Sequence, residues 1–145
     1  MNRIFIVLIM ICILTLGVGI GLNIQLVQYP IANVASIKTL GVSVWQNFNL
    51  TQPLTQIDWG MLEPNQSKTV ICYVQNEGNT PLTLSLWTEN WQPTTATDYI
   101  ILSWNLEGMM LNPAEVVEAQ LTLTVSPDIE NITNFSFDII ISGSG

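Results

Sequence analysis

The 145-residue sequence contains no histidine, three lysines and arginines together, and two cysteines. Without histidine, neither a Ser-His-Asp nor a Cys-His catalytic arrangement can form, and histidine-ligated zinc is excluded as well. Eleven acidic residues give a formal charge of −8, so the chain has no basic patch of the kind that binds nucleic acid. We therefore expect no catalytic residues, no cofactor and no nucleic-acid partner, and we expect that the protein is not an enzyme.

The two cysteines add little chemistry. Cys12 lies in an apolar N-terminal run, and Cys72 is alone in the rest of the chain, so no disulfide is expected within that part. One thiolate cannot build a thiolate zinc site, and we expect no metal site. Cys72 alternates with apolar residues, which predicts an inward position where it acts as a small hydrophobe.

One long uncharged run is present, the 19 residues from Ile4 to Leu22. A transmembrane helix needs about 20 apolar residues, whereas the apolar core of a signal peptide has about 7–15. The run therefore predicts a membrane anchor over residues 4–22, after a cytoplasmic tail of residues 1–3. Arg3 before the span places the N-terminus inside. The chain is then a single-pass protein of the cell membrane with its remaining residues outside.

A cleaved signal sequence is the alternative to a retained anchor. Val34-Ala35-Ser36 resembles a small-residue cleavage site, although it lies far beyond Leu22. Residues 23–36, which contain Pro30, are interpreted as a linker. Whether the N-terminal segment is cleaved stays open at this point.

Residues 37–145 alternate between apolar and polar side chains, which predicts strands. An immunoglobulin-type sandwich needs about 100 residues, close to the length of this part. Turn residues separate the alternating runs, as in an all-β sandwich. The runs cover residues 40–45, 67–76, 81–90, 99–106, 116–126 and 134–142, with a further short strand near 57–61 or 109–111. We predict an immunoglobulin-like sandwich of about seven antiparallel strands over residues 37–145.

The segments "IDWGMLEPNQSKTVICYVQNEGNTPLTLSLWTENW", "YIILSWNLEG" and "LTLTVSPDIENITNFSFDIIISGSG" carry a resemblance. From about Gly41 to Gly145, the chain resembles a group of short, mostly uncharacterised archaeal proteins that join an N-terminal membrane segment to an immunoglobulin-like domain. It is more distantly similar to surface-adhesion sandwiches and to TasA-like secreted fibre proteins, whose subunits can join by strand exchange. The resemblance implies a fold and a location, and it implies that Asn76, Gly78 and Asn79 form a structural turn.

Five tryptophans are present. The alternation places Trp104 in the core and places Trp59 and Trp91 at strand ends, where they would cap it. It places Trp45 and Trp87 on outer faces, where an exposed indole could stack on a sugar ring or pack against loops.

Several apolar residues occupy positions that alternate toward the outside, namely Ile71, Tyr73, Trp87, Ile101 and Ile140. Scattered exposed apolar residues are normal, whereas a contiguous patch marks an interface. If the strands that carry these residues are neighbours, they form one candidate interaction face. We expect such a face to bind a second copy or another surface protein.

Four Asn-x-Ser/Thr sequences, at Asn49, Asn65, Asn131 and Asn134, are candidate glycosylation sites in predicted loops or strand starts.

Three functions fit the sequence. The first is a non-enzymatic, membrane-anchored surface protein with a structural or protein-interaction role. The second is a processed filament or fibre subunit in which the strand near residues 37–45, or the strand over residues 135–142, inserts into a neighbour's sheet. The third is a carbohydrate-binding surface module that uses Trp45 or Trp87.

Overall fold

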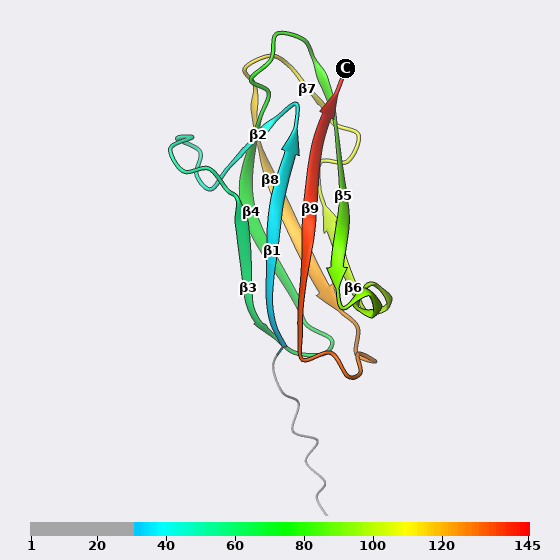
Figure 1. Ribbon diagram of the computed structural model, residues 1–145. Coiled ribbons are helices and arrows are strands. Elements are labelled where there is room, and N and C mark those ends of the chain that lie inside the picture. The colour runs from blue at the N-terminus through cyan, green and yellow to red at the C-terminus, as the bar shows by residue number, and fades with distance from the viewer. Residues whose placement is uncertain (1–30) are drawn as a thin grey trace, which may run out of the picture.

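The computed structural model describes residues 31–145, which form nine strands and one short 3-10 helix (Figure 1). In chain order they are β1 (Ile31–Leu40), β2 (Ser43–Trp45), β3 (Gln56–Leu62), β4 (Ser67–Gln75), β5 (Leu82–Gln92), η1 (Thr94–Asp98), β6 (Ile100–Trp104), β7 (Met110–Leu111), β8 (Val116–Val125) and β9 (Asn134–Ser144). Both segments considered for a further short strand, near 57–61 and near 109–111, are strands. The predicted tail of residues 1–3 and the predicted anchor over 4–22 lie outside the described residues.

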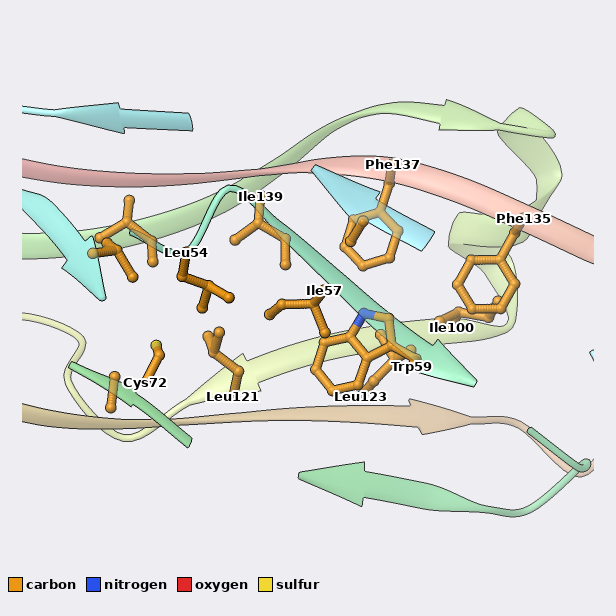
Figure 2. Packing of buried hydrophobic residues seen from close by; sticks show 14 of the residues in the cluster. Leu54, Ile57, Trp59, Cys72, Ile100, Leu121, Leu123, Phe135, Phe137 and Ile139 are labelled. Carbon is orange, nitrogen blue, oxygen red and sulfur yellow. The ribbon is translucent and has the colours of Figure 1, made fainter. Parts of the chain in front are cut away.

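The strands build two sheets that face each other. Sheet A has the strand order β3-β1-β9-β5-β7, and sheet B has the order β2-β4-β8-β6. Their inner side chains meet in one buried hydrophobic cluster (Figure 2). The predicted all-β sandwich is confirmed, with nine strands in the described part rather than about seven. No helix within residues 31–145 is long and apolar enough to cross a membrane.

The first strand begins at Ile31, inside the segment 23–36 that the sequence suggests is a linker. Its burial alternates, because Ile31, Asn33 and Ala35 point into the core while the residues between them are exposed. The strand follows Pro30, and a proline that cannot donate to a ladder suits a position just before a strand. The sandwich therefore starts six residues before residue 37.

β1 pairs with a neighbour on each side. It runs antiparallel to β3 and parallel to β9, from the pair Ala32–Asn134 to the pair Leu40–Ser142. Sheet A is therefore mixed, and the expectation of antiparallel pairing throughout is corrected. The strand order also differs from the immunoglobulin arrangement, in which the last strand lies at a sheet edge. Here the last strand, β9, lies between β1 and β5.

The chain passes from sheet A to sheet B at Gly41. Leu40 is 55% exposed, whereas Val42 and Val44, which alternate with it in the run over residues 40–45, are buried. The reason is local, because Gly41 has φ +77° and interrupts the alternation between β1 and β2. A Cβ on Gly41 would lie 2.6 Å from the carbonyl oxygen of Gly143 in β9. This close approach ties the crossover to the end of the last strand.

Aromatic rings fill the core at the end where β1 begins. Trp91 stacks on Phe137 with ring centroids 4.0 Å apart, and Phe135 stacks beside them. Trp59 is fully buried within this core rather than capping it (Figure 2). Trp104, expected in the core, is half-buried at the margin, where its Nε1 donates to Glu107.

The turn after β4 is organised by Asn76, a fully buried polar residue. Its side-chain oxygen accepts a hydrogen bond from the Gly78 N–H, and its Nδ2 donates to the carbonyls of Thr80 and Leu111. Every polar atom of the amide group is therefore used, as a buried amide requires. The structural role that the resemblance implies for this turn agrees with these bonds.

The substitutions Gly41→Ala and Gly108→Ala separate backbone strain from steric clash. Both glycines have positive φ, +77° and +73°, but an added Cβ meets nothing within 4 Å at Gly108. We expect Gly108→Ala to lower the free energy of unfolding by about 1–2 kcal/mol through strain alone. Gly41→Ala should cost clearly more, because the β9 backbone must also move. Urea denaturation of both variants measures the difference, and equal losses would contradict the close approach.

Candidate functional site

A solvent-open groove of about 650 Å³ lies beside the first residues of β1. The start of β1, the end of β5, the loop before β9 and the start of β9 line this groove. The lining residues are Ala32, Asn33, Val34, Gln92, Pro93, Asn131, Ile132, Thr133, Asn134, Phe135 and Ser136. None of these side chains is a carboxylate, an amine, a thiol or an imidazole. General acid–base catalysis needs such a group, and the hydroxyls of Thr133 and Ser136 have no base beside them in the lining.

Asn33 is the buried polar residue of this groove. It is 5% exposed, and its Nδ2 donates to the Gly60 carbonyl at 2.9 Å. Its Oδ1 has no hydrogen-bond partner within the described chain, and neither has the buried Nε1 of Trp59. An unsatisfied buried group costs about 1–3 kcal/mol. Asn33 could not be identified from the sequence, because the residue lies within the segment 23–36 that is predicted to be a linker.

Cys72 is fully buried, as expected for an inward position on β4. Burial raises the pKa of its thiol to about 12. The thiol therefore stays neutral at physiological pH and is a poor nucleophile, since the thiolate is the reactive form. Within residues 31–145, no three His, Cys, Asp or Glu side chains gather in a way that could hold a metal ion.

The five residues of the predicted interaction face do not lie on one surface. Ile71 and Tyr73 on β4 and Ile101 on β6 belong to sheet B, whereas Trp87 on β5 and Ile140 on β9 belong to sheet A. Within sheet B, strand β8 separates β4 from β6. The expectation of one contiguous patch is therefore not met.

Ile140 is only 4% exposed although it alternates toward the outer face. Its Cα partners are Trp87 on β5 and Lys38 on β1. These two long side chains flank it on both sides, which accounts for its burial. Trp87 remains exposed, and its Nε1 donates to Glu89.

An aromatic cluster stands on the outer face of sheet B at the β2 edge. Trp45 on β2 pairs with Tyr73 on β4, and the ring of Phe48 meets Tyr73 edge-on with centroids 5.8 Å apart. Phe48 is 67% exposed, and Ile71 lies two residues from Tyr73 along β4. Sequence reasoning missed Phe48, because it lies in a loop without alternation. Trp45 and Trp87, the two candidate sugar-stacking residues, belong to different sheets and cannot form one platform.

The outer face of sheet A carries an ion pair. The Lys38 Nζ lies 2.6 Å from Asp138 Oδ2, and Asn90 donates to the same oxygen at 2.7 Å. The hydrogen bonds from Asn90 and Lys38 lower the pKa of Asp138, and the bond to Asp138 raises the pKa of Lys38. The pair joins β1 to β9 across their parallel ladder.

All four candidate glycosylation asparagines are exposed. Asn65 and Asn131 have φ of +63° and +57°, a backbone conformation that asparagine tolerates better than most residues. Turn geometry therefore explains these two without a glycan. It offers no such reason for Asn49 and Asn134.

A scan against protein-family models finds no match to this chain. A search of curated proteins finds no significantly similar sequence.

The substitution Asp138→Asn tests the ion pair through its pH dependence. Because the folded pKa of Asp138 lies below its ordinary value of 3.8, the carboxylate stabilises the fold above that value and loses its effect as pH falls through the folded pKa. We expect wild type to exceed the variant in free energy of unfolding at neutral pH, and the difference to shrink as the pH is lowered below 3.8. Asp128→Asn, in the exposed loop after β8, is the control. A difference that persists undiminished in acid would contradict this role.

Replacing each candidate asparagine by glutamine, in protein made without glycosylation, separates turn geometry from glycan attachment. Asn65→Gln and Asn131→Gln should lower the free energy of unfolding by about 1 kcal/mol, because glutamine tolerates positive φ less well. Asn49→Gln and Asn134→Gln should change it little. Urea denaturation measures all four. Four equal losses would show that the backbone conformation is not what selects asparagine at residues 65 and 131.

Proposed function

We propose that the protein is a non-enzymatic cell-surface protein in which an N-terminal membrane anchor displays a β-sandwich, immunoglobulin-like in size and two-sheet architecture, for a structural or protein-interaction role. The observation that carries the proposal is the order of the chain. An uncharged run long enough to span a bilayer, residues 4–22, is followed after residues 23–30 by a strand that begins at one end of a complete sandwich.

The arrangement of the sandwich supports display. The chain enters at one end through Ile31, and the loop after β2, which carries Phe48, projects sideways from the half of the sandwich nearer the other end (Figure 1). With the anchor before Ile31, the aromatic cluster of Trp45, Phe48 and Tyr73 lies on the side of the sandwich, in the half farther from the membrane. Exposed aromatic residues are enriched where proteins meet other proteins.

The groove and the buried thiol support a non-enzymatic role. The groove beside β1 lacks acidic and basic side chains, and the pKa of Cys72 is raised to about 12. The net charge of −8 favours the solubility of an exposed domain.

The position of β1 disfavours cleavage at Val34-Ala35-Ser36. Cleavage there would remove Ile31 and Asn33 from the core, together with their pairs to β3 and β9. Both neighbours would then keep an unpaired edge. A processed chain that retains this sandwich would have to start before Ile31.

Strand exchange is the second candidate, because β1 lies in the interior of sheet A and its departure would open a slot between β3 and β9. In this structure the chain fills the slot with its own β1. Exchange would therefore break the pairing of β1 on both edges before a neighbour's strand could enter. This requirement makes exchange the less favoured function.

Mass spectrometry of the N-terminus, in protein purified from membranes and from shed material, tests the proposal. We expect a start at Met1 or Asn2 in the membrane fraction, because the span is long enough to be retained. The shed fraction serves as the control for processing. A start between about residue 17 and residue 31 as the dominant form would overturn the anchor and favour a processed subunit.

A further inference from the structure

The two sheets end in four edge strands, and three of these edges are protected. β2 is three residues long, and the Leu54 N–H already binds its Val44 carbonyl. On β3, Lys68 binds the Trp59 carbonyl and the Asp58 carboxylate binds the Gly60 N–H. β7 has two residues and is soon followed by Pro113. Short strands, charges and prolines are the usual means of preventing edge-to-edge pairing.

The fourth edge strand, β6, has none of these protections. Its sequence, Ile100-Ile-Leu-Ser-Trp104, contains no charge and no proline, and Ile101 is 66% exposed. The Ser126 N–H donates to the Tyr99 carbonyl, which fixes Ile100 and Val125 as a non-hydrogen-bonded pair of the β6–β8 ladder. The backbone groups of Ile100, Leu102 and Trp104 therefore point away from β8, toward the open edge.

We propose that two copies of this chain join through β6, in an antiparallel pair with Leu102 opposite Leu102 of the second copy. This register is self-complementary, as a two-fold interface requires. It sets Ile100 opposite Trp104 of the second copy, so that every outward backbone group of β6 gains a partner. Sheet B then continues from one molecule into the next.

The side chains fit the same register. On the outer face Ile101 lies beside Ser103 of the second copy, and on the inner face Leu102 meets its own equivalent. No charged residue lies within the strand, so the pairing brings no like charges into opposition although each chain carries a net charge of −8. A second copy is therefore a better occupant than a charged peptide.

The pairing sets the direction of the two molecules. The strands run along the long dimension of the sandwich (Figure 1), so antiparallel β6 strands point the chain-entry ends of the two copies in opposite directions. With the anchor of the proposed function, the pair joins two facing membranes rather than two copies in one membrane. This membrane-bridging geometry rests on the proposed function, whereas the strand pairing does not.

Cysteine cross-linking tests the register. Ile101→Cys and Ser103→Cys variants of the full-length chain, in a Cys12→Ser background, are purified in detergent, mixed and oxidised. The two positions form a non-hydrogen-bonded pair with Cα atoms about 4.5 Å apart, which a disulfide can span. We expect a disulfide dimer in the mixture and little in either variant alone. No cross-link in the mixture, or equal cross-linking in each variant alone, would overturn the proposal.

A charge substitution with a matched control gives a second test. Ile101→Lys adds a charge at the open edge, and Ile71→Lys adds one at a 50% exposed isoleucine on the outer face of the same sheet, but on the interior strand β4. By sedimentation analysis we expect Ile101→Lys to raise the dimer dissociation constant about tenfold or more, and Ile71→Lys to change it little. Circular dichroism verifies that both variants are folded. Equal effects, or a wild-type chain that is monomeric throughout, would overturn the pairing.

Reconstituted vesicles separate this pairing from the proposed anchor. Vesicles that carry the wild-type chain should cluster, and vesicles with Ile101→Lys should not. Specific cross-linking without clustering would keep the β6 pair and overturn the membrane-bridging geometry. A dimer formed by exchange of β1 would instead survive Ile101→Lys and give no 101–103 cross-link.

Discussion

The architecture depends on the double pairing of β1. This strand hydrogen-bonds to β3 on one edge and to β9 on the other, so the five strands of sheet A form one surface only while β1 is in place. Its inward side chains are Ile31, Asn33, Ala35 and Ile37, of which Asn33 and Ala35 bury little apolar area. Besides these core contacts, the strand is held by its backbone ladders, by the Asn33 bond to Gly60 and by the ion pair between Lys38 and Asp138.

Apolar residues serve two different purposes in the sandwich. The aromatic stack of Trp91, Phe135 and Phe137 fills the space between the sheets at the chain-entry end. Phe48 and Ile101 are instead exposed, at opposite edges of sheet B. Neither β2 nor β6 contains a charged residue, which leaves these edges available for contacts with other molecules.

Much of the fold could be predicted from the sequence, because a period of two assigns faces wherever apolar and polar residues contrast strongly. Cys72, Leu121 and Phe137 follow that rule. β1 escaped it, because alanine, asparagine and serine give little contrast. The period also cannot say which strands are neighbours. Ile71 and Ile140 therefore seemed to share a face although they lie on different sheets, and only the neighbours Trp87 and Lys38 reveal why Ile140 is buried.

The parallel pairing of β1 and β9 has a mechanical consequence. A pull on the chain before Ile31, resisted by the rest of the sandwich, acts along the axis of β1. The hydrogen bonds on both edges of the strand then lie across the direction of the force and share the load, whereas a strand peeled from its end loses its bonds one after another. If the domain is held at this end and pulled from another cell, β1 is the strand that resists unfolding. It is also the strand that the alternation of the sequence predicts least clearly.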